Sequence, residues 1–409
     1  MTTLVLYDDE RARQFEPFAL TRPASELRAG ALLQRERWER ALGERAAASV
    51  AAPHLAHFAE FDAPPVAADG RLAAGSIVAN SRFAVSLGPL DRDAGVWRAG
   101  GRVAAVRLAR DVEVAELDGG AMALDALVGS GARETSVVGR WVDEVWELVG
   151  ALNTQLLEDL PQLATGLPEA ELPAGVHVAG GHRVTFEPGA TVEPFALLDA
   201  RAGPIHLAAG ATVHAFTRLA GPCYVGRSSS VLGDRVSSCS IGDACRVRGE
   251  MSVTVMLGHA NKGHDGFVGH SYLGRWANLG AGTTTSNLKN TYGPVALWTP
   301  AGLRDTGLQF LGSLLGDHAK TGIGTRLTTG SVIGAGANLY GSSMPPKYVE
   351  PFAWGDGAPY GAYDLDKFLT VAERAMSRRQ VALDDRGRLQ LAAAYRQGRQ
   401  GAHAGSARR

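Results

Sequence analysis

From residue 175 onward, small and aliphatic residues recur every six positions along the chain. The longest register runs through Leu315, Thr321, Leu327, Ile333 and Leu339, and glycines flank many such positions. This period fits neither an α-helix, which repeats every ~3.6 residues, nor a pleated strand, which repeats every ~2. It fits a triangular coil whose sides each send one aliphatic residue inward. Because a coil buries these residues only against neighbouring coils, we predict a left-handed parallel β-helix over residues 175–345.

The first 165 residues have a different pattern, which predicts a compact α/β domain. The apolar run Thr3–Tyr7 ends at two acids, as a buried strand would, and Ser76–Ala79 and Val103–Leu108 are further strand candidates. Apolar residues at helical spacing predict amphipathic helices over Leu27–Leu42 and Val142–Leu160. We therefore expect domains at residues 1–165 and 175–345, joined by a linker over Pro161–Pro173.

Residues 346–409 follow the last hexad and are expected to form a helical extension and a tail. Leu365–Arg379 has helical spacing, whereas Gln397–Arg409 is basic and poor in apolar residues. The sequence predicts a helix in the first segment and a disordered tail in the second.

Composition limits the classes of partner. The net charge is -1 with 20% charged residues, which gives no global basic field for nucleic acid. No apolar run approaches the length of a membrane span, and the first residues lack a signal-peptide pattern. Three cysteines in a chain of 409 residues are typical of buried thiols in a reducing compartment. We expect a cytoplasmic enzyme that binds small molecules, with no nucleic-acid or membrane partner.

Lysine is unusually rare. Of 41 basic residues only five are lysines, and the first 261 residues contain none. Because arginine supplies the generic positive charge, a lysine here is a candidate for a position that needs a compact ammonium. Lys262, Lys289 and Lys320 are therefore candidate ligands for phosphate or carboxylate; a solvated surface position is the alternative for each.

Two stretches, Met256–Gly269 and Asn287–Leu311, break the six-residue register. Regular coils leave little room for chemistry, so these breaks are where loops can form a site. The first break contains His259 and His264, and His270 follows it directly. Acyl transfer from a thioester needs a general base near neutral pKa, which imidazole supplies, and donors for the developing oxyanion, which asparagine amides or backbone N–H groups supply.

Three motifs in this region carry a resemblance to a known family: KGHDGF at 262–267, GHSYLG at 269–274 and NLGAGT at 278–283. They resemble a divergent branch of the bifunctional N-acetylglucosamine-1-phosphate uridyltransferase/glucosamine-1-phosphate acetyltransferase family. The resemblance implies acetyl-CoA as acyl donor, a role in making UDP-N-acetylglucosamine or a similar nucleotide sugar, and a homotrimer. The chain departs from the main bifunctional family at Phe267, where that family has tyrosine, and at the family's later substrate lysine, which is out of register here although Lys289 is nearby.

The resemblance also assigns residues. His264 stands at the family's histidine spacing from Asn278 and becomes the candidate base, with His270 as the second candidate. Asn278 and Asn287 would hold substrate hydroxyls. The remaining substrate-binding candidates are Lys262, Lys289, Lys320, His270 and Tyr272. Coenzyme A would lie along the later coils near Gly330–Gly336.

The N-terminal segments TRP at 21–23, LRAG at 27–30 and ERW at 36–38 resemble the sugar nucleotidyltransferase domain of the same branch. The resemblance implies that Arg22, Arg28, Arg37 and Asn80 bind a nucleoside triphosphate, because forked guanidiniums clamp phosphates well. Such transfer would need Mg²⁺, for which the carboxylates Asp8 and Asp9 are candidates.

The classical Gly-x-Gly-Thr-Arg-Met loop of these enzymes is absent. One alternative is therefore an acyltransferase whose N-terminal domain only binds or assembles. A second comes from His259 and His264, which lie five residues apart. This spacing resembles the zinc-binding histidines of trimeric β-helix carbonic anhydrases, which implies a zinc-dependent hydratase.

Overall fold

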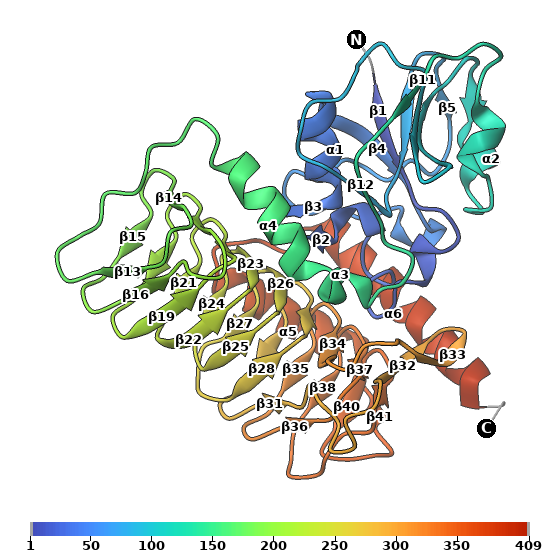
Figure 1. The fold of residues 1–409 in the computed structure, drawn as a ribbon. Coiled ribbons are helices and arrows are strands. Elements are labelled where there is room, and N and C mark those ends of the chain that lie inside the picture. The colour runs from blue at the N-terminus through green and yellow to red at the C-terminus, as the bar shows by residue number, and fades with distance from the viewer. Residues whose placement is uncertain (1–2, 407–409) are drawn as a thin grey trace. The chain divides into compact units, whose positions relative to one another are not determined.

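The computed structural model describes residues 3–406, of which 401–406 are described by their backbone alone. The chain forms two compact units (Figure 1). The first consists of Met1–Val145 with Asp384–Gln397, and the second of Trp146–Leu383 with Gly398–Arg409. None of the described helices is both long enough and apolar enough to cross a membrane.

A mixed six-stranded sheet organises the first unit. In spatial order its strands are β11 (Glu134–Ser136), β8 (Val96–Ala99), β9 (Arg102–Arg107), β6 (Ile77–Asn80), β1 (Leu4–Tyr7) and β4 (Ala46–Val50). Strand β1 runs parallel to both β4 and β6. Its alternating side chains enter two apolar clusters, with Leu4 and Leu6 in one and Val5 and Tyr7 in the other. The carboxyl ends of β1, β4 and β6 therefore meet at one edge of the sheet.

The helix predicted over Leu27–Leu42 is shorter than expected. Residues up to Leu33 form a small hairpin of β2 (Arg28–Ala29) and β3 (Leu32–Leu33), and helix α1 is confined to Gln34–Leu42. The hairpin turns at Gly30, whose φ of 64° lies in the left-handed region that favours glycine. The apolar spacing of this segment thus came from a buried hairpin followed by a helix.

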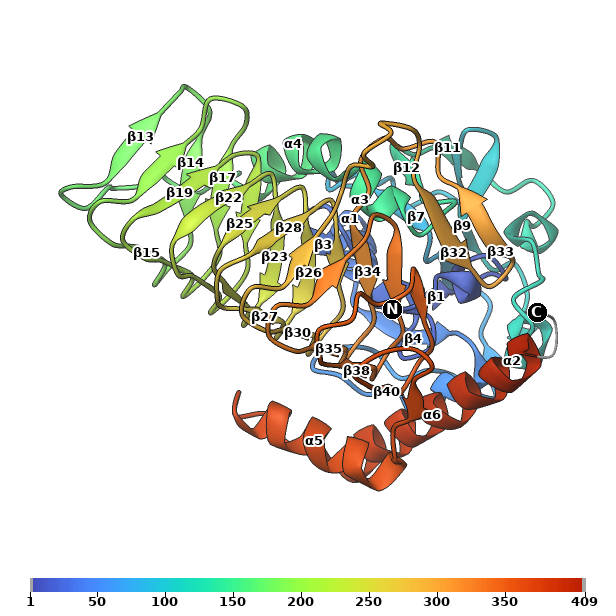
Figure 2. The same cartoon turned by 90° about the horizontal axis from the view of Figure 1, so that it is seen from below.

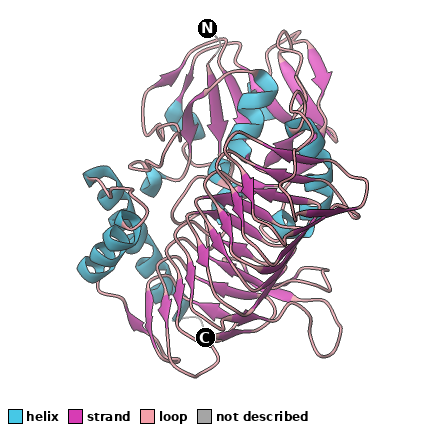
Figure 3. Ribbon diagram, turned by 90° about the vertical axis from the view of Figure 1, so that its left-hand side faces the viewer, coloured by secondary structure: helices cyan, strands magenta, loops and turns pink. Residues whose placement is uncertain are grey.

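The second unit is the predicted left-handed β-helix, which the strand register confirms. Its coils stack so that their strands form three sheets, here called the first, second and third faces (Figure 3). Neighbouring strands in each face are parallel, except for the last two strands of the third face, which are antiparallel. The first face contains β13 (His177–Ala179), β16 (Leu197–Asp199), β19 (Thr217–Ala220), β22 (Asp234–Ser237), β25 (Glu250–Ser252) and β28 (Phe267–Gly269). The second contains β14 (Val184–Phe186), β17 (Ile205–Leu207), β20 (Cys223–Val225), β23 (Ser240–Asp243), β26 (Val255–Gly258), β29 (Tyr272–Leu273), β34 (Ser313–Leu315), β37 (Ser331–Ile333) and β39 (Tyr348–Val349). The third contains β15 (Thr191–Val192), β18 (Thr212–Val213), β21 (Ser230–Val231), β24 (Arg246–Val247), β27 (Asn261–Lys262), β30 (Asn278–Leu279), β35 (Lys320–Thr321), β38 (Asn338–Leu339), β40 (Ala353–Gly355) and β41 (Gly361–Ala362).

The hexads that predicted this fold point into the prism. Leu315, Leu327, Ile333 and Leu339 belong to one apolar cluster that runs the length of the β-helix, and Thr321 is buried in the same register. Each coil covers the apolar residues of its neighbours, which is why the stack is stable where a single coil would not be.

Of the two predicted register breaks, only Asn287–Leu311 leaves the prism. The prediction is wrong for Met256–Gly269, which stays in the regular coils as β26, β27 and β28, with Lys262 at an inward position. After β31 (Thr284–Thr285), residues 286–312 leave the coil, form the hairpin of β32 (Ala296–Thr299) and β33 (Gly302–Asp305), and return at β34. Strand β31 pairs with β36 (Arg326–Leu327) of the next coil. The chain thus places a loop at the corner between the first and second faces.

Helices accompany the β-helix. The segment predicted as one helix over Val142–Leu160 forms α3 (Glu147–Gly150) and α4 (Leu152–Leu163), so the helix extends past Pro161, where the linker was expected to begin. Helix α5 (Leu365–Ser377) lies along the third face (Figure 2). The disordered tail expected from Gln397 is wrong as far as Ser406, because α6 (Asp385–Ser406) continues to that residue. Residues 407–409 of that tail lie outside the described residues.

Candidate functional site

A cavity of about 450 Å³ opens at the carboxyl edge of the N-terminal sheet. Its polar lining includes Asp9, Arg11, Asn80, Arg82 and Arg102. Asp9 follows β1, and Asn80 ends β6. Ligands of open α/β sheets bind at this edge, where parallel strands end together. The position therefore makes the cavity the candidate nucleotide site of the first unit.

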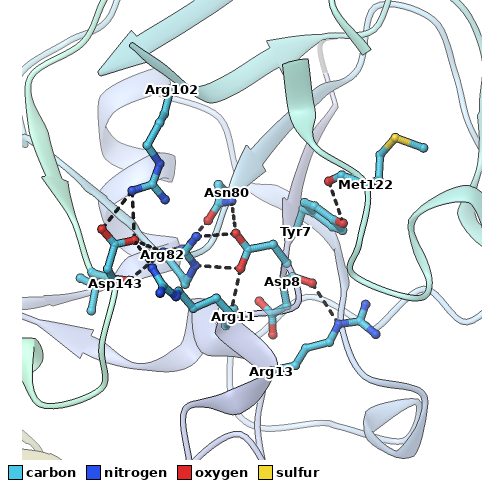
Figure 4. A network of polar contacts seen from close by, with 12 residues as sticks. Tyr7, Asp8, Arg11, Arg13, Asn80, Arg82, Arg102, Met122 and Asp143 are labelled. Carbon is cyan, nitrogen blue, oxygen red and sulfur yellow. Dashed lines mark hydrogen bonds and ion pairs between the residues drawn. The ribbon is translucent and has the colours of Figure 1, made fainter. Parts of the chain in front are cut away.

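Asp9 and Arg82 line the cavity and lie at the centre of its polar network (Figure 4). Arg82 donates from Nε to Oδ1 of Asp9 at 2.7 Å and from an Nη to Oδ2 at 2.6 Å. The amide of Asn80 also donates to Oδ2 at 2.9 Å. Although burial opposes its ionisation, the hydrogen bonds from Arg82 and Asn80 hold the pKa of Asp9 below its ordinary value. Asp9 thus fixes the arginine and the amide at the cavity floor.

Three guanidiniums converge on Asp143 beside this pair (Figure 4). Arg82 and Arg102 donate to its carboxylate at 2.7 and 3.0 Å, and Arg11 lies 3.4 Å away. Arg102 also stacks over the Trp141 ring, 3.7 Å from its centroid. Arg11 and Arg102 are about half exposed. They can therefore turn toward an incoming phosphate at small cost.

Asp8 and Asp9 do not provide a preformed Mg²⁺ site. Both oxygens of Asp9 already accept hydrogen bonds from Arg82. Asp8 is 2% exposed, accepts the Ala24 N–H at 2.8 Å and is absent from the cavity lining. Burial raises the pKa of Asp8 to about 6. Among the side chains that the structure describes, residues 3–400, no group of three or more His, Cys, Asp or Glu is placed to hold a metal ion. The burial of Asp8 and its hydrogen bond from the Ala24 N–H are typical of a structural acid.

The three arginines predicted to bind nucleotide are buried outside this cavity lining. Arg22 forms an ion pair with Glu60 at 2.8 Å. Arg37 donates to the carbonyls of Val85 and Ala29 at 2.8 and 3.0 Å, and Arg28 donates to that of Ala31. The contacts of Arg37 tie α1 to the β2–β3 hairpin and to β7 (Phe83–Val85). Among the predicted nucleotide ligands, only Asn80 lines the cavity.

Sequence reasoning missed Arg102 and Trp141. They lie on β9 and β12 (Gly139–Trp141), far apart in sequence, and each is one more arginine or aromatic in a region rich in both. Arg82 carried a signal, since it stands two residues after Asn80 at the end of a strand.

In the β-helix, the structure pairs His270 with Asn287. His270 lies at the corner between the first and second faces, and Asn287 lies one coil further on, where the 286–312 loop leaves. The two side chains are joined through Nδ2 of Asn287 and Nδ1 of His270 at 2.9 Å, and Phe310 of the loop stacks on the imidazole at 5.3 Å. Burial lowers the pKa of His270. A Cβ on Gly269 would lie 2.7 Å from Nδ2 of Asn287, so the glycine permits this approach.

His264, the predicted base, lies at a different corner. Its side chain is exposed, and its backbone carbonyl accepts a hydrogen bond from Lys262. Lys262 is fully buried and also donates to the Asp265 carbonyl at 2.6 Å. Burial lowers its pKa to about 8. Lys262 thus points inward and holds the corner together, whereas substrate binding would require an exposed ammonium.

The other predicted residues fall in two places. Asn278 and Lys320 are register partners on the outer side of the third face and line one pocket. Tyr272 is fully buried on the second face, and Lys289 donates to the Pro294 carbonyl within its own loop. The structure therefore groups Asn287 with His270 and Asn278 with Lys320. This grouping depends on how the 286–312 loop and the turns connect successive coils, which the six-residue pattern does not predict.

His259 and His264 do not form the zinc pair of the alternative hypothesis. His259 lies at the corner between the second and third faces, and His264 between the third and first. His259 packs on Trp276 with 4.3 Å between ring centroids, and its Nδ1 lies 3.4 Å from a guanidinium nitrogen of Arg275. A neighbouring cation disfavours a bound metal ion.

Comparisons with known proteins support the resemblance found in the sequence. Residues 4–167 match the family model described as "Sugar nucleotidyl transferase". A stretch of 130 residues, 32% of this chain, is 26% identical to the "Bifunctional protein GlmU" of Methanococcus vannielii. These matches confirm the resemblance to the GlmU-like family. They support a transferase with a sugar nucleotidyl transferase domain. The chain spans about 30% of the length of that relative.

Solved structures similar to this chain include a hexapeptide transferase family protein from Anaplasma phagocytophilum, with 14% identity and a TM-score of 0.27 over 54% of this chain and 95% of its own. A UDP-N-acetylglucosamine acyltransferase from Campylobacter jejuni shows 11% identity and a TM-score of 0.20 over 54% of this chain and 94% of its own. TM-scores of 0.27 and 0.20 mean that these structures superpose poorly on this chain. The β-helix assignment rests on the strand register of the chain itself.

Proposed function

We propose that the N-terminal domain joins a sugar 1-phosphate to a nucleoside triphosphate with release of pyrophosphate. The observation that carries the proposal is the cavity at the carboxyl edge of the sheet, within the region that matches the nucleotidyl transferase family. Arg11, Arg82 and Arg102 supply the positive charge that the phosphates need. The resemblance favours UDP-N-acetylglucosamine or a similar nucleotide sugar as product. Because the carboxylates do not fit Mg²⁺, no step is assigned to a metal ion held by the protein.

Pyrophosphate release from UTP or dTTP, with a panel of sugar 1-phosphates, tests this activity. We expect Arg102→Gln to lower kcat/KM at least tenfold, since a lost phosphate contact of this kind is worth about 1.5–3 kcal/mol. Arg110→Gln is the matched control, because Arg110 is exposed, lies outside the cavity lining, and contacts Glu116 and the Asp111 carbonyl. Full activity of the Arg102 variant, or no release with any substrate pair, would contradict the proposal.

For the β-helix we propose acyl transfer from acetyl-CoA to a sugar, supported by the His270–Asn287 pair in the motif region that resembles the acetyltransferases. As placed, Nδ2 of Asn287 donates to Nδ1 of His270, which puts the proton of a neutral imidazole on Nε2. The carboxamide turned by 180° accepts from Nδ1–H and leaves Nε2 free to take a proton from the acceptor. Catalysis through Nε2 uses this second orientation.

Release of the free thiol of coenzyme A tests this step. Loss of a general base costs about 10²- to 10⁴-fold, which is the decrease we expect for His270→Ala. His264→Ala is the matched control, and we expect a change of less than about threefold because an exposed side chain with few contacts contributes little. A selective loss in the His264 variant would restore the base assigned from the sequence and reject His270.

We also propose a cytoplasmic homotrimer. The family resemblance supports this assembly, and two stacked phenylalanines, Phe195 and Phe216, are 68% and 77% exposed on the β-helix. Exposed aromatic surface of this kind favours a protein contact. Multi-angle light scattering of the purified chain gives the mass directly, and a monomer at micromolar concentration would reject the trimer.

A further inference from the structure

The third face of the β-helix carries a column of polar side chains on its outer side. Strand register aligns Arg246 with Asn261, Asn261 with Asn278, and Asn278 with Lys320. Each strand here sends its first residue outward and its second into the core. Successive coils therefore stack these four side chains into one row, although they span 75 positions of sequence from 246 to 320.

A pocket of about 410 Å³ lies over this column. Its other wall is the end of α5, which supplies Ala375, and the two residues that follow the helix, Arg378 and Arg379. Figure 2 shows α5 running alongside the strands of the third face. The helix is anchored by Phe368, which packs edge-on against His318 at 5.9 Å and Phe352 at 5.0 Å. The pocket is thus bounded by two elements that are packed together.

The charged side chains that line the pocket are all basic. Arg246, Lys320, Arg378 and Arg379 line it, and its lining contains no acid. Arg246 donates to the carbonyls of Ser228 and Cys245, and Lys320 donates to that of His318. In the part of the chain that the structure describes, none of these four cations forms an ion pair. Four like charges gathered without a counter-charge are costly, and an anion removes that cost.

The electrostatics of individual groups agree with this crowding. Burial lowers the pKa of Lys320 to about 8. Burial, and then the neighbouring charges of Arg246 and Arg378, lower the pKa of Arg379. The lowered pKa of Lys320 thus reflects its burial, and that of Arg379 also reflects the nearby cations.

The neutral donors of the pocket suit a phosphate. Nδ2 of Asn261 donates to Oδ1 of Asn278 at 2.9 Å, which fixes both amides and leaves the Asn278 amide its own two N–H groups. Guanidinium forks match phosphate oxygens, and an ammonium adds a point charge. A volume of about 410 Å³ falls within the range of small-molecule sites, and is larger than a single inorganic ion needs.

We propose that this basic pocket, between the third face and the end of α5, binds a small molecule that carries a phosphomonoester or diphosphate. Lys320 and Arg246 bind the anion from the β-helix, and Arg379 binds it from the far wall. The ligand neutralises the pocket and holds α5 against the coils. The site is separate from the cavity of the N-terminal sheet, and the proposal does not depend on nucleotidyl transfer.

Calorimetric titration of the full chain with inorganic pyrophosphate tests the proposal. The Arg102→Gln protein serves as the background, so that the N-terminal cavity contributes little. We expect saturable binding that Arg379→Gln weakens at least tenfold and that Arg374→Gln leaves unchanged. Arg374 is the matched control because it is exposed on the same helix and outside this pocket. Absence of saturable binding, or equal binding by the Arg379 variant, overturns the proposal.

Limited trypsin digestion gives a second measurement that needs no variant. Trypsin cleaves after Arg378 and Arg379, and bound pyrophosphate should slow that cleavage; an unchanged rate counts against the proposal. Displacement of pyrophosphate by coenzyme A, but less by dephospho-coenzyme A, would identify the coenzyme's 3′-phosphate as the source, and displacement by glucosamine 1-phosphate would identify a sugar phosphate. If none of the three displaces it, the assignment to a phosphorylated metabolite is wrong. Loss of pyrophosphate release in the nucleotidyl transfer assay would leave these results unaffected.

Discussion

The N-terminal cavity and the basic pocket of the β-helix have similar volumes, about 450 and 410 Å³, and both gather arginines. They differ in what neutralises those arginines. Arg82 is bound by Asp9 and Asp143, whereas Arg246 and Arg379 have no carboxylate in their pocket lining. The paired arginines stabilise the protein around them and are already oriented by their carboxylates at the proposed phosphate site, whereas the unpaired arginines have no counter-charge until a ligand binds. Counting arginines in a sequence therefore does not locate a binding site.

The largest loss of stability should follow from removing the ion pairs of Arg82 in the N-terminal cavity. We expect Arg82→Ala to lower the free energy of unfolding by about 3–5 kcal/mol, because it leaves the carboxylates of Asp9 and Asp143 without their main partner in a partly buried site. Urea denaturation of the full chain measures this. Arg379→Ala, in the unpaired region, should be neutral or slightly stabilising without ligand. Equal losses in both variants would remove the distinction between the two regions.

The sequence predicted the β-helix well because its repeat is local. Each six-residue side of the coils over Leu315–Leu339 carries its own inward residue, so six residues suffice to read the pattern. Site geometry depends on contacts between coils, which a local pattern does not contain. Asn278 and Lys320 are 42 positions apart yet adjacent in register, because the 286–312 loop lies between them.

The N-terminal arginines were harder to interpret for a different reason. Arg22 and Arg37 stand in motifs that suggest phosphate binding, but both are buried and satisfied by Glu60 or by backbone carbonyls. Whether a guanidinium faces solvent or the core depends on tertiary packing. The cavity residues Arg102 and Trp141 come together only when β9 and β12 fold into one unit.

A smaller effect should come from Lys262, a cation held by carbonyls alone. We expect Lys262→Ala to cost about 2–4 kcal/mol, since it leaves a cavity and exposes the His264 and Asp265 carbonyls without their donor. Chemical denaturation at pH 7 measures the loss, with the exposed Lys367→Ala as control at less than about 0.5 kcal/mol. A variant as stable as the control would mean that the corner is held by other contacts, and would reopen a binding role for Lys262.

Asp8 should give the smallest effect, with a distinctive pH dependence. Its pKa in the folded protein is about 6, above the ordinary value of 3.8. Between these values the folded state binds more protons than the unfolded state, so stability falls as pH rises through about 4 to 6. Asp8→Asn keeps an acceptor for the Ala24 N–H and removes this fall, and we expect it to stabilise the protein by about 1–3 kcal/mol at pH 7 and by little at pH 4. Denaturation curves at the two pH values measure the difference. If the substitution instead abolishes pyrophosphate release at unchanged stability, Asp8 acts in catalysis, and the N-terminal acids are more than the framework that holds the arginines in place.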